Sequence, residues 1–559
     1  MISARAVFAV VTARLLAYPL YGYALGMNNH SIQIPLVRHL QNPALYPGDR
    51  FVATLDNYTS FFWPAIAWLT LYLPVDATFA VGHFFAELLL LGGVFALAAA
   101  TFPETPWAPY AALWSVLWAN PRIGGESIHW FYFTHTQVAT ASAIWCLALA
   151  ARGAWNSAFL LAGLIFNIHA MEAVYIGAML AVAALTEPRL MVRRLLGGGG
   201  VAALAALPGL YWLASAGALG SPPDLAELLR AFFPEHFFVS AFTAAHWKTL
   251  VGVGIVLFVA SLRVERTERV KRLLAMIAGA LLLVVVGTVS AELRPTPTLL
   301  KLHALRVIPT VIVLSLILAS GWLATLARPR EQPLAAIAFR VLAVSLPLAI
   351  GLDSFDFESP FHRAVAFVAF ASGVAALLLL ATTRALLGAS ITLTVCAIAF
   401  AWILPTREFT PFQGKAKRID WIATQNWARE NTPIDARFFT PPMVHGFRTF
   451  SERSVAAEWL DGSATMFDAA YADYWRGWYL DMGGEFASAY GRRIWDRLGA
   501  VYAERTLADL TLLARKYEAD YMVVPRGRLG TNLALLPLYQ NASYAVVATP
   551  PQQNPNEPN

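Results

Sequence analysis

Acidic, basic and imidazole side chains interrupt this largely apolar chain at only a few places, and these are the residues that could do chemistry. Asp49 follows a Pro-Gly dipeptide in the polar stretch 27–59, which also contains Asn28 and His30. A carboxylate held in such a turn can act as a general base or bind a divalent metal. It can equally cap the segment that follows, and the local sequence leaves both roles open.

Two other polar groups combine a carboxylate and a histidine about one helical turn apart. Glu126 and His129 form the first pair, and His169 and Glu172 form the second. Side chains at this spacing share one face of a helix, where they could bind a substrate, relay a proton or ligate a metal. A hydrogen-bonded pair with a purely structural role is the alternative. With Asn28 and His30, these four are the candidate substrate-binding residues.

Cationic side chains gather at the start of an apolar segment, at Lys301, His303 and Arg306. His303 and Arg306 should share a helix face, whereas Lys301 is only loosely aligned with His303. Cations at a membrane boundary can hold a lipid phosphate, since arginine offers two parallel N–H donors. They can also extend toward lipid headgroups without binding a particular ligand. The pattern predicts a lipid-phosphate site at these three residues.

The elements that must position these residues are membrane helices. Of 559 residues, 58% are hydrophobic and 14% are charged, whereas a soluble domain has about 25% charged residues. Apolar stretches of about 18 or more residues recur throughout the first 405 positions, which excludes an ordinary soluble enzyme. The net charge of +6 comes largely from short clusters between apolar segments, which indicates membrane topology and not nucleic-acid binding. No nucleotide-binding, zinc-protease or cysteine-pair motif assigns a cofactor.

We expect a polytopic helical membrane domain over residues 1–405, with about 11–13 transmembrane helices. The apolar run 156–186 is too long for one helix and is broken at 167–172, which predicts two short helices meeting at a buried turn. The positions of Lys and Arg require one early segment, for example 107–119, to be re-entrant or interfacial. Candidate spans lie near residues 6–26, 60–76, 80–100, 107–119, 134–151, 156–186, 196–216, 249–262, 273–291, 303–326, 334–352, 361–381 and 384–405.

A soluble α/β domain is expected over residues 406–550, followed by a disordered Pro/Gln/Asn-rich tail at 551–559. Helices are predicted at 420–431 and 505–517, and strands at 436–440, 449–451 and 521–525. The basic clusters between spans should face the cytoplasm, so this domain should lie outside it, in the periplasm of a bacterium with the chain in its inner membrane. Its aromatic residues, including Trp459, Trp475, Trp478 and Tyr479, either form its core or rest on the membrane.

This layout of a first helix, an outward loop with an acidic residue, many further spans and an outward α/β domain resembles the GT-C superfamily of membrane glycosyltransferases. The local stretches that carry the resemblance are Pro-Ala-Leu-Tyr-Pro-Gly-Asp at 43–49, Thr-x-Thr-Gln-Val-Ala at 134–139 and Gly-Leu-Ile-Phe-Asn-Ile-His at 163–169. The later stretches 427–438, 447–453 and 516–525 are similar to an uncharacterised bacterial family of the same layout. GT-C enzymes often carry an acidic pair in the first loop, whereas Asp49 has Arg50 beside it.

The resemblance implies transfer of a sugar from a polyprenyl-phosphate carrier to a glycan or protein acceptor at the outer membrane face. In this hypothesis Asp49 is the general base, and Arg306 holds the lipid phosphate with help from Lys301. A non-enzymatic assembly or scaffold protein of the cell envelope is the alternative, favoured by the missing acidic pair. A secondary transporter is a third possibility, although no internal repeat is visible.

Overall fold

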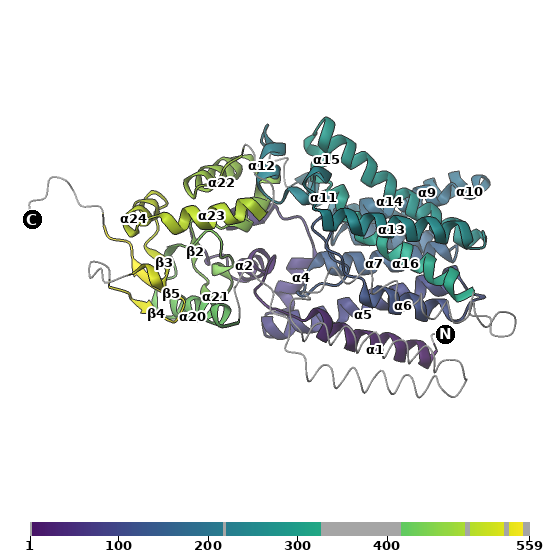
Figure 1. Cartoon of the computed structure of the whole chain (residues 1–559), viewed down its shortest axis with the longest axis horizontal. Helices are drawn as coiled ribbons and strands as arrows, with labels where there is room; N and C mark the ends of the chain where they lie inside the picture. The colour runs from purple at the N-terminus through teal and green to yellow at the C-terminus, as the bar shows by residue number, and fades with distance from the viewer. Residues whose placement is uncertain (1–2, 216–219, 326–414, 487–491, 530–535, 552–559) are drawn as a thin grey trace, which may run out of the picture. The chain divides into compact units, whose positions relative to one another are not determined.

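A computed structural model describes residues 3–215, 220–325, 415–486, 492–529 and 536–551 of the chain (Figure 1). The contacts between residues divide the chain into two compact units. The membrane unit comprises Met1–Tyr23, Ala80–Tyr211 and Glu235–Arg407, and the C-terminal unit comprises Ala24–Phe79, Trp212–Pro234 and Glu408–Asn559. The predicted spans 334–352, 361–381 and 384–405 and positions 552–559 of the predicted tail lie outside the described residues.

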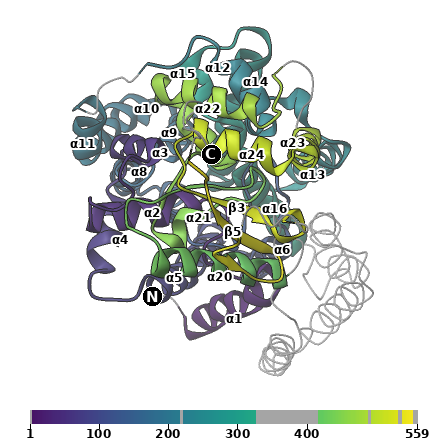
Figure 2. The ribbon, with the colours of Figure 1, turned by 90° about the vertical axis from the view of Figure 1, so that its left-hand side faces the viewer.

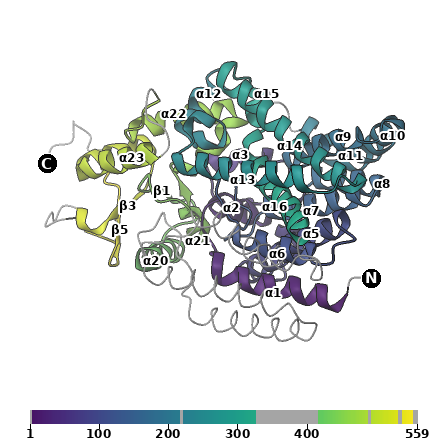
Figure 3. The same cartoon turned by 45° about the vertical axis from the view of Figure 1, so that its right-hand side comes forward.

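Long apolar helices make up the membrane unit. Helix α16 (Ile308–Thr325) is buried along nearly its whole length, and helices α6 (Ala108–Trp118), α13 (Ala244–Arg263) and α14 (Glu268–Leu293) pack around it (Figure 3). Within the described residues, five helical segments are long and apolar enough to cross a membrane: α5 (Val75–Thr101), Pro188–Ser215, α13, α14 and Pro297–Thr325. The polytopic helical membrane fold expected from the sequence is confirmed.

The break predicted at 167–172 is also confirmed. Helix α8 (Trp155–Phe166) ends directly before it, and α9 (Ala170–Ala184) begins within it. Asn167 holds the turn, because its amide donates to the carbonyl of Ala205 at 2.8 Å and accepts from the amide of Gly209 at 2.7 Å. His169 caps α9 by accepting the backbone N–H of Glu172. Polar side chains thus satisfy the helix ends that meet here.

Two early segments differ from full membrane spans. The predicted span over 60–76 is wrong, because its helix α4 (Phe62–Leu69) has only eight residues. At 1.5 Å per residue it is about 12 Å long, against a hydrocarbon thickness of about 30 Å. Helix α6 has 11 residues and reaches about 16 Å, which agrees with a re-entrant or interfacial segment. Helices α1 (Ala4–Tyr21) and α7 (His135–Ala151) complete this part of the membrane unit.

The C-terminal unit contains a five-stranded mixed sheet with the order β2-β1-β3-β5-β4. Strand β1 pairs in parallel with β2 and β3, and β5 pairs antiparallel with β3 and β4. Helix α20 (Lys415–Asn431) packs against β4 and β5, and α24 (Leu507–Lys516) packs against β3 (Figure 2). The α/β domain is therefore confirmed. The strands are β1 (Arg437–Phe439), β2 (Ser454–Val455), β3 (Tyr521–Pro525), β4 (Tyr539–Gln540) and β5 (Tyr544–Ala548).

One predicted strand is a helix. Residues 449–451 belong to α21 (Phe447–Ser451), because the carboxylate of Glu458 accepts the N–H groups of Gly446 and Phe447, each at 2.8 Å. A carboxylate at this place satisfies amides that a helix start leaves unpaired and complements its dipole. Besides α4, further helices of the unit among the described residues are α2 (His30–Gln41), α3 (Arg50–Thr54), η1 (Leu55–Asn57), α12 (Leu225–Ala231), η7 (Trp459–Met466), α22 (Ala469–Asp481), α23 (Arg492–Glu504) and η8 (Arg526–Arg528).

The tryptophan-rich part of the C-terminal unit forms a core. Trp459, Trp475, Trp478 and Tyr479 are each at most 1% exposed. The rings of Trp475 and Tyr479 stack with centroids 5.2 Å apart, and Trp459 lies 5.9 Å from Trp475. Of the two roles open to these aromatic residues, packing inside the domain is the one they have.

Candidate functional site

Glu126 lies on a tight turn between helices α6 and α7. The backbone N–H and carbonyl groups of Ile123 and Glu126 bond to each other at 3.2 Å, with Gly124 and Gly125 between them at φ +65° and +78°. Two successive positive φ angles are the signature of a type I′ turn, which glycine adopts without steric cost. A Cβ on Gly124 would lie 2.4 Å from the carbonyl oxygen of Leu305, and one on Gly125 would lie 2.1 Å from Nε2 of His236. The Gly-Gly sequence therefore permits the close approach that places Glu126.

The turn brings Glu126 to Arg306. Oε1 of Glu126 lies 3.1 Å from Nη1 of Arg306. Glu126 is buried, and the Arg306 side chain is 19% exposed. Arg306 lies on the short helix η5 (Ala304–Val307), and its backbone N–H donates to the carbonyl of His303, whose φ is +49°. Tyr175 donates its hydroxyl to the carbonyls of Leu302 and His303 and so fixes this backbone.

More ionisable side chains surround this pair. The charge of Arg306 acts on His135, His169, Glu172 and His236, and that of Glu126 acts on Glu172. The rings of His135 and His169 stack with centroids 4.7 Å apart. We call this group the Arg306 site: Glu126, His135, His169, Glu172, His236 and Arg306. Sequence analysis selected four of the six, and it missed His135 and His236 as members.

The pKa values at the edge of the Arg306 site suit proton transfer near neutral pH. Burial raises the pKa of Glu126 to about 7, against the opposing charges of Arg306 and Arg122. Burial, with the nearby charge of Arg306, lowers the pKa of His236 well below its usual value. The site therefore combines a permanent cation, a carboxyl group that titrates near neutrality and a neutral imidazole. Such a set can bind an anion and accept or release a proton.

His129 lies in a different network of the membrane unit. Its Nδ1 is hydrogen-bonded to Glu87, and its Nε2 lies 2.8 Å from the carbonyl oxygen of Val116. Because a carbonyl only accepts, Nε2 must carry a proton. The ring also stacks on Tyr21 with centroids 4.4 Å apart. His129 is fully enclosed, and its contacts hold the loop that carries Glu126. Its role as a substrate-binding residue remains a prediction.

Glu87 is an ionisable residue that sequence analysis missed. It lies within the apolar helix α5, where its second carboxylate oxygen accepts from the amide of Gln137 at 3.2 Å. A carboxylate inside a membrane span is costly without such partners. Its position within the predicted span 80–100 was the signal that could have found it.

Asp49 lies in the C-terminal unit with its carboxylate fully engaged. Oδ1 accepts the N–H groups of Phe51 and Val52, which caps helix α3, and Oδ2 accepts that of Val455. The guanidinium of Arg448 donates to both carboxylate oxygens, with Nε 2.6 Å from Oδ2 and Nη2 3.2 Å from Oδ1. The side chain has no exposed surface. A general base needs an oxygen free to take a substrate proton, so this geometry favours the capping role; the catalytic role of Asp49 remains a prediction.

Arg448 also binds two further buried carboxylates. Its Nη1 lies 3.0 Å from Asp461 and 3.5 Å from Glu458. Burial raises the pKa of Glu458 to about 7 and that of Asp461 to about 6, while the charge of Arg448 opposes both shifts. We call Arg448 with Asp49, Glu458 and Asp461 the Arg448 hub. Four ionisable groups thus share one buried site in the C-terminal unit.

Asn28 and His30 lie in the C-terminal unit as well. The backbone carbonyl of Asn28 accepts the N–H and the hydroxyl of Ser31, at 2.9 and 2.7 Å. His30 is buried, and its Nδ1 accepts the N–H of Gly26 at 3.0 Å. These contacts shape the start of helix α2. Substrate binding by Asn28 and His30 remains a prediction.

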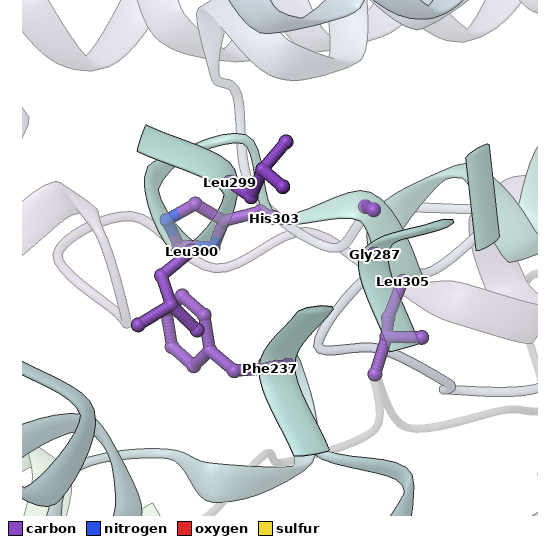
Figure 4. A pocket seen from close by; sticks show the side chains of 8 residues that line it. Phe237, Gly287, Leu299, Leu300, His303 and Leu305 are labelled. Carbon is purple, nitrogen blue, oxygen red and sulfur yellow. The ribbon is translucent and has the colours of Figure 1, made fainter. Parts of the chain in front are cut away.

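Lys301 and His303 stand before Arg306 in the membrane unit. Lys301 ends the short helix α15 (Pro297–Lys301) and is half-buried. The ring of His303 lies 4.3 Å from that of Phe237, and both line a small pocket whose other lining residues are apolar (Figure 4). Aliphatic side chains from helices α14 and α15 and the following turn complete its wall. The other lining residues are Gly287, Ala291, Leu299, Leu300, Ala304 and Leu305.

The part of the chain that the structure describes shows no candidate metal site. No group of three or more His, Cys, Asp or Glu side chains there is arranged to hold an ion. The divalent metal considered for Asp49 remains a prediction.

Comparisons with known proteins give a match to a family model and matches to solved structures. Residues 419–479, which span α20 to most of α22, match a domain of unknown function (DUF6798). No curated protein matches the chain. The structure is similar to the crystal structure of ArnT from Cupriavidus metallidurans bound to undecaprenyl phosphate, with 13% identity, 98% of each chain covered and a TM-score of 0.45. A likeness of this size assigns neither activity nor ligand to the chain.

Proposed function

We propose that this chain is a GT-C-like membrane glycosyltransferase that takes a sugar from a polyprenyl-phosphate carrier at the outer face of a bacterial inner membrane. The observation that supports it is the Arg306 site, where a partly exposed guanidinium lies just before the apolar helix α16, within a segment long enough to span the membrane. Arginine binds phosphate through parallel N–H donors. In this proposal the C-terminal unit faces the periplasm, and the acceptor is a glycan or a protein.

The reaction needs a group that stabilises the departing lipid phosphate and a group that takes a proton from the acceptor hydroxyl. Arg306 suits the first task, since it can neutralise negative charge that develops as the bond between the sugar and the phosphate oxygen breaks. Glu126 is the carboxylate paired to Arg306 and suits the second. Asp49, the base predicted from the sequence, would first have to leave Arg448 and three backbone amides.

The experiment is sugar transfer in proteoliposomes that contain the full-length chain and a panel of polyprenyl-phosphate-linked radiolabelled sugars. Arg306→Gln should lower transfer about 10²–10³-fold, the usual cost of losing one donor to a developing oxyanion. Arg306→Lys keeps the charge without the fork and should lie between Gln and the wild type. Arg294→Gln removes an exposed arginine at the C-cap of α14 and should leave transfer unchanged. Equal activity of Arg306→Gln and the wild type would refute the role of Arg306.

A non-enzymatic scaffold protein of the cell envelope is the second candidate function. The carboxylate of Asp49 is buried and paired with Arg448, which favours a structural role over a catalytic one. A scaffold would show no transfer with any donor. Its gene-deletion phenotype would be restored as well by Arg306→Gln as by the wild type. The two functions are therefore separated by the same pair of variants.

A further inference from the structure

Two arginine–carboxylate pairs among the described residues, Arg448 with Asp49 and Arg306 with Glu126, differ in geometry. Arg448 holds Asp49 with two nitrogens on two oxygens and has no exposed surface. Arg306 contacts Glu126 through one nitrogen and one oxygen at 3.1 Å, and its side chain is 19% exposed. Its Nε has no hydrogen-bond partner among the described residues. The pair with Glu126 thus leaves the buried Nε of Arg306 without an acceptor, which a second anion can supply.

Glu126 is a weakly held partner. It is buried, and the interacting charges around it are those of Arg306, Arg122 and Glu172. The two arginines attract a negative charge at Glu126, and Glu126 in turn repels a negative charge at Glu172. Burial outweighs that attraction, so the pKa of Glu126 is raised. The carboxylate can therefore leave the guanidinium, or take up a proton, when another anion arrives.

We infer that Glu126 occupies the place of an anionic phosphate at Arg306, and that the phosphate group of a ligand displaces it and accepts from the guanidinium. This inference deepens the proposed function and rests on it for the source of the phosphate, a long-chain lipid. Glu126 then determines specificity, because a neutral headgroup has no charge with which to displace it. The displaced carboxylate is left beside the bound phosphate, where a base is needed.

Binding of undecaprenyl phosphate to the full-length chain in detergent tests the exchange without requiring turnover. At pH 8 the ionised Glu126 competes with the ligand, so Glu126→Gln should bind undecaprenyl phosphate about tenfold more tightly than the wild type. At pH 6 the gain should shrink, because Glu126 of the wild type is then largely protonated. Glu126→Asp keeps the charge and should bind like the wild type.

Matched controls separate the exchange from a general change in the protein. Glu187→Gln removes a carboxylate from the Arg194 and Arg272 pairs elsewhere in the membrane unit and should leave binding unchanged. Undecaprenol has the same tail without the phosphate, and its binding should not respond to Glu126→Gln. Inorganic phosphate supplies the charge without the tail and identifies a soluble source.

Each outcome supports or refutes the exchange of Glu126 for phosphate at Arg306, the proposed lipid-dependent function, or both. Tighter binding of undecaprenyl phosphate to Glu126→Gln, lost again on adding Arg306→Gln, supports the exchange. Unchanged or weaker binding to Glu126→Gln at pH 8 overturns it and makes Glu126 a positioning residue. Tightening seen only with inorganic phosphate keeps the exchange and refutes the lipid-dependent function. Binding of no phosphate by any variant refutes both.

Discussion

Arg448 is the residue on which the buried charge of the C-terminal unit depends. Its removal leaves Asp49, Glu458 and Asp461 close together without a cation, all at most 3% exposed. Breaking a buried pair costs about 3–5 kcal/mol because the remaining charge is uncompensated. Arg448→Met should therefore lower the free energy of unfolding by about that amount, measured in the full-length chain by chemical denaturation. Arg429→Met removes a more exposed arginine next to Glu430 and should cost about 0–1 kcal/mol. Equal effects of the two variants would contradict a structural role for the hub.

The same hub predicts how stability depends on pH. The pKa of Glu458 is raised from 4.5 to about 7 and that of Asp461 from 3.8 to about 6, both chiefly by burial. A group with a raised pKa stabilises the folded state fully below its unfolded pKa, and this contribution is lost as pH rises through the folded value. Unfolding midpoints should therefore fall between about pH 4 and pH 7. Asp461→Asn should flatten the slope, and a slope of the opposite sign would show that other groups dominate.

Among the elements, the turn from Ile123 to Glu126 offers the sharpest test of how the Arg306 site is positioned. Gly125→Ala requires a positive φ that costs an L-residue about 1–2 kcal/mol, and its Cβ would collide with His236. The variant should shift Glu126 from Arg306 and, like Glu126→Gln, tighten binding of undecaprenyl phosphate at pH 8, measured by titration. Gly252→Ala is the control, since that glycine lies in helix α13 and a Cβ there would meet nothing within 4 Å. Unchanged binding by Gly125→Ala would show that the turn tolerates a different shape.

Local elements were largely predictable, because their signals lie in neighbouring residues. Strand β3 has the predicted bounds, 521–525, and helix α20 ends at Asn431 as expected before Thr432-Pro433. A membrane span was wrongly predicted over the apolar run 60–76, because its composition alone does not show that helix α4 ends at Leu69. Helix α21 was missed because Glu458, the carboxylate that fixes its start, lies beyond the segment.

The candidate site was predictable in its residues but only partly in its geometry. Glu126, His169, Glu172 and Arg306 were selected because polar groups in an apolar chain are costly, and they converge. Asp49 was selected by the same argument, but its partner Arg448 is 399 positions away. The spacing of neighbouring residues in the sequence cannot indicate a pair that is so far apart. The sequence therefore could not show that this carboxylate is already engaged.

At the scale of the whole molecule, the C-terminal unit is assembled from distant parts of the chain. The segment Ala24–Phe79 belongs to it, although most of the membrane unit lies between them in sequence. Besides the ion pair of Asp49 with Arg448, backbone groups of this segment bind side chains of the later part. The hydrogen bonds are Arg418 to the carbonyl of Leu25 at 2.9 Å, Arg437 to that of Gly48 at 2.6 Å and Ser454 to that of Pro47 at 2.9 Å.

Residues 415–559 expressed alone should consequently fail to fold as a stable domain. Arg448 would keep Glu458 and Asp461 but lose Asp49, and a hydrophobic contact of Phe51 with Tyr471 would be lost as well. Joining residues 24–60 to this fragment through a flexible linker should restore a cooperative unfolding transition, measured by circular dichroism. Asp49→Asn in the joined fragment should lower its midpoint, because the amide cannot neutralise Arg448. A cooperative transition of residues 415–559 alone, with the midpoint of the joined fragment, would show that the early segment adds nothing to the stability of the unit.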